Sequence, residues 1–133
     1  MTIPTIPILC IAVAYLLVYI PHFVAGSQRF KMPEGFDNNH PRDQTARLAG
    51  WAKRASAAHM NGHETFSPFA IAVVVAWLGH ASEHTIGMLA IAFVVLRTLY
   101  IAAYIGDKAF IRSALWTCSL LVTFTLFLLP LFS

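Results

Sequence analysis

The chain alternates between long apolar stretches and shorter polar segments, and each apolar stretch is long enough to cross a membrane as a helix. At 1.5 Å per residue, about 20 apolar residues span the hydrocarbon core of a bilayer. The first stretch contains no Lys, Arg, Asp or Glu. The pattern predicts an all-α, polytopic transmembrane four-helix bundle, with helices over residues 3–25, 43–80, 85–105 and 110–132.

The polar connections differ in length, which limits how these helices can be arranged. The first connection, residues 26–43, contains the turn-forming residues Gly26, Pro33, Gly35 and Pro41 and shows no helical period. The two later connections are short, so the helices that they join must be antiparallel neighbours. No internal repeat divides the chain, and we expect a single domain over residues 1–133.

The second stretch has a polar first half and an apolar second half. One long helix that emerges from the membrane explains both halves, with Asp43 available to cap its start and Pro68 expected to bend it. Where the polar half lies at membrane depth, it must face protein or a water-filled cavity.

Composition supports a membrane protein and excludes several other classes. The chain is 58% hydrophobic and 11% charged, whereas soluble domains carry about 25% charged residues. Too little polar surface remains to cover a soluble globule of this size. The net charge of +3 suits an anionic leaflet or a small anionic ligand. Nucleic acid is not expected as a partner, because no basic stripe is interleaved with aromatic residues.

The basic residues all fall on one side of the predicted membrane topology. They are Arg29, Lys31, Arg42, Arg47, Lys53, Arg54, Arg97, Lys108 and Arg112. The positive-inside rule makes this side cytoplasmic and places both termini outside the cytoplasm. The N-terminus lacks a basic region and a cleavage site of small residues, so we expect no removable signal.

Disulfide and metal chemistry are not expected. Cys10 and Cys118 lie in the middle of apolar stretches, where buried packing is the ordinary role of cysteine. His59 and His63 are spaced i, i+4 beside Glu64, but the order differs from the zinc motif HExxH and no third ligand is obvious. We predict no metal site, and a packing or interhelical hydrogen-bonding role for both histidines.

Three groups of polar residues are candidates for chemistry, and the first lies on the second stretch. Arg54, Asn61 and Glu64 fall within about 80° of one another on a helix, so a cation, an amide and a carboxylate share one face. The alternative is a capped helix end whose cation extends to the membrane surface and forms an ion pair.

The second group is Arg97, Tyr100 and Tyr104, which share one stripe of the third stretch. A charge inside the bilayer costs about 2.5–3.5 kcal/mol on insertion scales, so Arg97 is expected to face a partner. Glu64 is the acid best placed to serve, and a structural Arg97–Glu64 pair is the alternative to a binding role. The two tyrosines are equally compatible with an aromatic belt at the membrane surface.

The third group is Arg112 and Ser113, at the start of the fourth stretch. A cation and a hydroxyl beside a helix N-terminus favour an anion, because the unpaired N–H groups and the helix dipole also attract negative charge. The alternative is an interfacial arginine that anchors the helix.

These groups lie in two segments that resemble the signatures of the MAPEG family, the membrane-associated proteins in eicosanoid and glutathione metabolism. Residues 54–69 resemble its second-helix pattern, roughly Arg-x-x-x-Ala-His-x-Asn-x-x-Glu followed by an aromatic residue and a Pro. Residues 97–113 resemble the family's third-to-fourth-helix signature. The short chain and the loop ending in Asn-His-Pro-Arg look like the bacterial branch, which implies a bacterial inner membrane and periplasmic termini.

The resemblance implies a homotrimer that binds glutathione between adjacent protomers near the cytoplasmic face. By position, Asn61, Glu64 and Tyr104 match glutathione contacts, and Arg112 matches the arginine thought to stabilise the glutathione thiolate, with Ser113 beside it. Arg54, Arg97 and Arg112 also offer cations for the two carboxylates, and Glu64 offers a partner for the amine. The expected glutathione-binding set is therefore Arg54, Asn61, Glu64, Arg97, Tyr100 and Tyr104, with Arg112 and Ser113 as catalytic residues.

The residues and the resemblance together predict a glutathione-dependent membrane enzyme, a transferase or a peroxidase. Glutathione is the expected co-substrate, and a lipophilic electrophile or hydroperoxide enters from the lipid. Met60 and Ala57 stand where several family members carry Arg, and Tyr100 stands where some carry His. These departures motivate the alternative, a non-enzymic membrane protein of the same fold that binds a lipid or another ligand.

Overall fold

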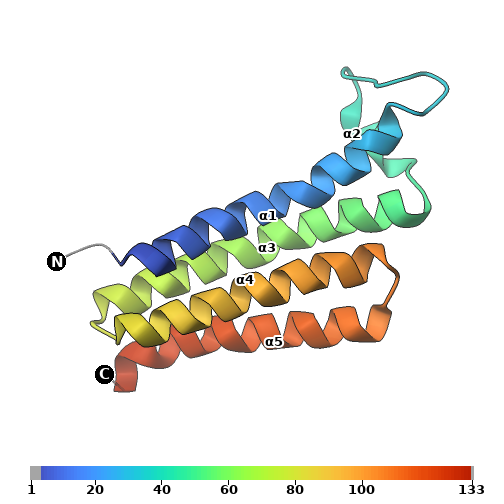
Figure 1. Ribbon diagram of the computed structural model, residues 1–133. Helices are drawn as coiled ribbons and strands as arrows, with labels where there is room; N and C mark the ends of the chain where they lie inside the picture. Colours follow the sequence, from blue (N-terminus) through green and yellow to red (C-terminus); the bar gives the residue numbers. More distant parts are fainter. Residues whose placement is uncertain (1–3, 133) are drawn as a thin grey trace.

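The computed structural model describes residues 4–132, and Figure 1 shows the long helices α1, α3, α4 and α5 packed side by side. The elements are α1 (Thr5–Arg29), α2 (Pro41–Ala46), α3 (Gly50–Leu78), α4 (Glu83–Ile105), α5 (Ala109–Leu128) and the 3-10 turn η1 (Leu129–Phe132). The start of α1 and the turn η1 lie at one end of the bundle, and α2 and the α4–α5 connection lie at the other end (Figure 1). The predicted all-α bundle is confirmed.

The two short connections end their helices in the same way. In each, the residue after a glycine has a left-handed backbone, with φ of 61° at His80 and 59° at Asp107. The next amide then bonds back to the carbonyl five residues earlier, at 3.0 Å for Ala81 and 2.9 Å for Lys108. This six-to-one bond is a common way to close a helix end. It turns the chain within a few residues and makes the joined helices antiparallel neighbours.

The single helix predicted over residues 43–80 is wrong at its beginning. The chain forms α2, leaves the helical conformation at Arg47, and starts α3 at Gly50. Leu48 accounts for the break, because it is 4% exposed and packs with Ala25 and Ala52 between the ends of α1 and α3. Gly50 has a φ of 56°, a conformation that glycine adopts without strain.

The connection before α2 is folded around Gln44, which is fully buried. Its amide nitrogen donates to the Gly35 carbonyl at 2.6 Å, and its amide oxygen accepts from the Asp37 N–H at 3.1 Å. The Asp37 carboxylate accepts from the N–H groups of His40 and Asn39, at 3.0 and 2.9 Å. These backbone hydrogen bonds, led by that from His40, lower the pKa of Asp37 below its ordinary value.

Aromatic stacking and small side chains hold the long helices together. Phe69 of α3 and Phe93 of α4 are both buried, and their rings stack with centroids 3.8 Å apart. Gly62 brings α3 against α1, because a Cβ atom there would lie 3.4 Å from Val18. Close approach through small residues is the usual way in which helices associate in lipid.

The outer surface of the bundle is apolar, as expected for helices that face lipid. Leu16 of α1 is 64% exposed and Leu121 of α5 is 60% exposed. Helices α1 and α4 and the segment Ala109–Phe132 are each long and apolar enough to cross a membrane. Helix α3 is as long, but its first half is polar. The predicted burial is confirmed for Cys10 and wrong for Cys118, which is exposed on the outside of α5.

Candidate functional site

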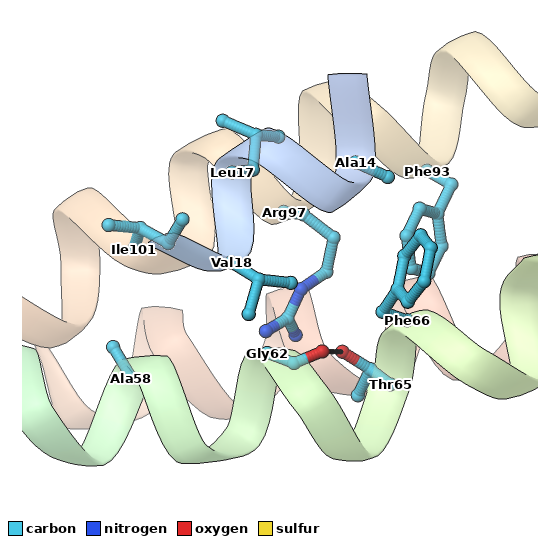
Figure 2. Close-up of a pocket in the computed structure, with 10 residues that line it drawn as sticks. All are labelled: Ala14, Leu17, Val18, Ala58, Gly62, Thr65, Phe66, Phe93, Arg97 and Ile101. Carbon is cyan, nitrogen blue, oxygen red and sulfur yellow. Dashed lines mark hydrogen bonds between the residues drawn. The ribbon is translucent and has the colours of Figure 1, made fainter. Parts of the chain in front are cut away.

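Arg97 is the most deeply buried cation of the site, with 4% of its surface exposed. Figure 2 shows its side chain reaching from α4 toward α3, with the guanidinium near Gly62 and Val18. Its Nη2 donates to the Asn61 side-chain oxygen at 2.9 Å. The cavity around it has a volume of about 10 Å³, about the size of one water molecule. Arg97 is thus fixed inside the bundle by α3.

The direct Arg97–Glu64 pair, which was the alternative to a binding role for Arg97, does not form. Asn61 stands between the two charges, because its amide nitrogen donates to Glu64 Oε2 at 3.3 Å while its oxygen accepts from Arg97. An amide can serve both partners at once, since it carries a donor and an acceptor. Glu64 itself is exposed. The three residues therefore form a chain of hydrogen bonds that connects the buried Arg97 guanidinium to the accessible Glu64 carboxylate.

A ladder of two tyrosine rings, with a cation at each end, follows the predicted stripe of α4 toward α5. The Arg97 guanidinium lies 3.9 Å from the centroid of the Tyr100 ring. The Tyr100 and Tyr104 rings meet edge to face, with centroids 5.6 Å apart. The Arg112 guanidinium lies 4.6 Å from the centroid of the Tyr104 ring. Each such contact is worth about 0.5–2 kcal/mol. The ladder thus joins the cation on α4 to the cation on α5.

The far end of this ladder borders an open hollow between α4 and α5, which we call the tyrosine hollow. It has a volume of about 450 Å³ and is lined by Tyr100, Tyr104, Arg112, Ser113, Trp116 and Thr117. A ligand pocket for a small molecule typically measures about 300–1,000 Å³. The structure therefore brings four of the predicted site residues into one space of suitable size.

A smaller hollow of about 140 Å³ adjoins the tyrosine hollow through Trp116, which lines both. Glu64 and Thr65 of α3 and Ser119 of α5 also line it. Glu64 therefore lies on the same side of the bundle as Arg112 and reaches the hollow system from α3. Trp116 and Ser119 were missed in the sequence, because an aromatic residue and a serine in an apolar helix carry no local signal of a site.

Arg54 lies away from Asn61 and Glu64, although all three share a helix. Its Nε donates to the carbonyl of Ile105 at 3.0 Å, and its Nη1 lies 4.0 Å from the Asp107 carboxylate. A cation at this position satisfies a terminal carbonyl of α4 and complements the helix dipole. The alternative weighed for this arginine concerned the end of its own helix, whereas here Arg54 binds the end of α4.

His59 and His63 of α3 pack with His22 of α1, a contact that the sequence did not predict. His59 and His63 have ring centroids 4.7 Å apart, and the His22 ring of α1 lies 4.8 Å from that of His59. The His59 Nδ1 donates to the Val18 carbonyl at 2.7 Å, which realises the predicted interhelical hydrogen bond. Within residues 4–132 no three side chains converge in a geometry that would hold a metal ion.

These features define an integral membrane protein whose polar and aromatic site lies among α3, α4 and α5. The model of the MAPEG family matches residues 6–132, and the chain belongs to this family. The MAPEG fold is a four-helix transmembrane bundle, which confirms the predicted fold class. The family includes glutathione-dependent transferases and peroxidases as well as non-enzymic members. The comparison with curated proteins found no significant match.

Proposed function

We propose that the protein is a glutathione-dependent membrane enzyme, a transferase or a peroxidase acting on lipophilic electrophiles or hydroperoxides. The observation that carries this proposal is the tyrosine hollow, where Arg112 and Ser113 stand beside Tyr104. Family membership supports it, because glutathione-dependent enzymes are common in this family.

Arg112 has the chemistry that a thiol substrate needs. A free thiol has a pKa near 8.5 and is mostly protonated at neutral pH, and a neighbouring guanidinium lowers that pKa. A shift of two units corresponds to about 2.7 kcal/mol of thiolate stabilisation. In a transfer to a chlorinated arene, the thiol proton passes to water, the thiolate sulfur bonds to carbon, and chloride leaves. Ser113 donates a hydrogen bond to the same sulfur.

The remaining residues divide into those that meet glutathione and those that position them. Tyr104 and Tyr100 line the hollow, and Glu64 lines the adjoining space, where it receives the glutathione amine. Arg97 holds Asn61 and supports Tyr100 from inside the bundle. Arg54 acts at a distance, by fixing the end of α4 that carries Tyr104.

We further propose a homotrimer with the site on the cytoplasmic side of a bacterial inner membrane. In this arrangement a neighbouring protomer closes the open side of the tyrosine hollow. Labelling in whole cells tests the orientation, in a Cys118→Ser background that removes the exposed thiol. A cysteine placed by Ser82→Cys should react from outside the cell, and one placed by Asn38→Cys only after the cells are opened. The reverse result would reject this orientation.

Turnover with glutathione tests the activity. Detergent-purified protein, mixed with glutathione and a chlorodinitrobenzene-type electrophile, should form the thioether and show the ultraviolet absorbance of a bound thiolate. Arg112→Ala should lower kcat/KM by about 25-fold at pH 7, because the thiolate fraction falls from about three-quarters at a pKa of about 6.5 to about 3% at a pKa of about 8.5. Lys108→Ala is the matched control, because it removes an exposed cation four residues earlier, at the start of α5.

Two outcomes would contradict the proposal. Absence of both turnover and thiolate absorbance in the folded wild-type protein would reject glutathione as the co-substrate. Equal losses in Arg112→Ala and Lys108→Ala would show that net charge, rather than the guanidinium in the hollow, matters. Circular dichroism and size-exclusion chromatography of each variant show that the helices and the assembly remain intact.

A non-enzymic binding protein of the same fold is the second candidate. It is favoured by the face of α3 that carries Ala57 and Met60, where Met60 exposes 64% of its surface and offers no charge. This candidate predicts tight binding of a lipophilic ligand without turnover. A measured thioether product that depends on Arg112 would exclude it.

A further inference from the structure

The buried guanidinium of Arg97 is only partly satisfied by hydrogen bonds. Its Nη2 donates to the Asn61 side chain, and the centroid of the Tyr100 ring lies 3.9 Å from its carbon. Its Nη1 is also buried, and among the described residues it is the one buried side-chain nitrogen or oxygen without a hydrogen-bond partner. Such an N–H group is costly, because it has given up its hydrogen bonds to water and gained none in return. We therefore expect a partner for Nη1 that is not one of the described side chains.

The small cavity around Arg97, which we call the arginine cavity, has room for such a partner. Its volume of about 10 Å³ is enough for one water molecule. The side chains that line it are apolar, apart from those of Arg97 and Thr65. Figure 2 shows the guanidinium beside Gly62, on the turn of α3 that also carries the Thr65 hydroxyl. Two polar side chains thus share a space of the size of a water molecule.

The hydroxyl of Thr65 determines which small partner fits. Its single proton is engaged within α3, by the carbonyl of Asn61 at 3.1 Å or that of Gly62 at 3.3 Å. Its oxygen keeps lone pairs that accept a hydrogen bond, whereas Arg97 offers donors alone. A water molecule between them can accept from Nη1 and donate to Thr65. A monoatomic anion would also accept from Nη1, but it would face the lone pairs of Thr65 and it is larger than water.

We propose that the arginine cavity binds one water molecule, which accepts a hydrogen bond from Arg97 Nη1 and donates one to Thr65 Oγ1. This water completes the hydrogen bonds of a cation that reaches the Glu64 carboxylate only through Asn61. Thr65 and Phe93 line both the arginine cavity and the smaller hollow that the exposed Glu64 borders. Water therefore has a short route to this position from the smaller hollow.

Magic-angle-spinning NMR of the intact protein in lipid bilayers tests the proposal directly. With isotope-labelled arginine, the side-chain signals of Arg97 are assigned by their loss in Arg97→Met. Cross-peaks between these nitrogens and water protons should be present in the wild-type protein. They should be lost in Thr65→Val, which keeps the shape of the side chain and removes the hydroxyl, and retained in Thr65→Ser. A folded wild-type protein without these cross-peaks would overturn the proposal.

Thermal unfolding gives a second measurement. Thr98→Val is the matched control, because the exposed Thr98 hydroxyl donates to a carbonyl of its own helix, that of Val94, as the Thr65 hydroxyl does. Thr65→Val should lower Tm by about 4 °C more than Thr98→Val, roughly the effect of one hydrogen bond in a protein of this size. Equal shifts in the two variants would contradict a bound water. So would a Tm that rises when chloride replaces gluconate in the wild-type protein but not in Arg97→Met, since the cavity would then hold an anion.

Discussion

The tyrosine hollow differs in its use of positive charge from a second hollow, of about 640 Å³, which lies among α1, α2 and α3 and which we call the histidine hollow. In the tyrosine hollow, Arg112 is supported by an aromatic ring 4.6 Å away, and the ring ladder leads back to the buried Arg97. In the histidine hollow, three imidazoles lie beside the cations of Arg42 and Lys53. One hollow therefore presents a single cation that packs against an aromatic ring, and the other gathers two cations and three imidazoles from three helices.

This difference fits two kinds of ligand. A group that must stabilise a thiolate at every turnover benefits from a cation that never loses its proton and does not reorient. Several hydrogen-bond donors that lie side by side suit an anion with several oxygen atoms. Helix α3 separates the two, since Asn61 and Glu64 serve one side and His59 and His63 the other.

The largest expected effect comes from removing the hydrogen bond between Asn61 of α3 and Arg97 of α4. Asn61→Leu leaves the buried Arg97 guanidinium without its hydrogen bond at Nη2 and should lower the free energy of unfolding by about 2–3 kcal/mol. Met60→Leu, the preceding and exposed position, should change it by less than about 0.5 kcal/mol. Denaturant titration in mild detergent measures both variants. Equal stability of the two would show that Arg97 finds another partner.

The next largest expected effect comes from removing the Tyr104 ring, which packs against the Arg112 guanidinium. Tyr104→Leu removes the cation–π contact and should lower kcat/KM for glutathione about tenfold, which corresponds to about 1.4 kcal/mol. Tyr104→Phe keeps the ring and should retain most of the activity. If the two substitutions cost the same, the hydroxyl of Tyr104, rather than its ring, acts on the substrate.

A smaller effect on stability is expected from two neighbouring cations at the start of α3, Lys53 and Arg54. Arg54→Ala removes the hydrogen bond to the Ile105 carbonyl and should reduce stability by about 1 kcal/mol. Lys53→Ala, at the preceding and exposed position, should leave the stability nearly unchanged. Thermal unfolding of both variants provides the comparison. Equal stability of the two would show that the Arg54 hydrogen bond does not stabilise the end of α4.

The smallest effect is local and lies in the polar connection beside the histidine hollow. The folded connection lowers the pKa of Asp37 from its ordinary value of 3.8, chiefly through the hydrogen bond from the His40 amide. The stabilisation is therefore present above that value and is lost as the pH falls through the lower, folded pKa. Exchange of the Asn39 and His40 amides should accelerate as the pH approaches and passes below 3.8, relative to amides elsewhere in the chain. Asp37→Asn should remove this acid step, and an unchanged profile would show that the carboxylate does not order the connection.

The sequence predicted the parts of the fold that depend on local pattern. The apolar stretches and the glycines before the left-handed turns at His80 and Asp107 placed α4 and α5 to within two residues at their starts. The break before α3 was missed, because it depends on Leu48 finding a buried position against Ala25, which is distant in the chain. The same holds for Gln44, whose polar side chain is buried by partners in the connection.

The candidate site was predictable along each helix and less so between helices. The stripe of Arg97, Tyr100 and Tyr104 follows from helical spacing, and the ring contacts follow that stripe. Spacing alone could not show that Asn61 would stand between Arg97 and Glu64. It also could not show that His22 of α1 would join His59, because that contact depends on how α1 and α3 are rotated relative to each other.

Trp116 forms a common wall between the tyrosine hollow and the smaller space that Glu64 enters. A ligand bound on one side of Trp116 therefore alters the volume available on the other side. The indole is also a natural fluorophore, so the protein carries a built-in optical reporter at the boundary. Binding of a ligand in either hollow should change the fluorescence emission of Trp116, even when the ligand itself has no optical signal.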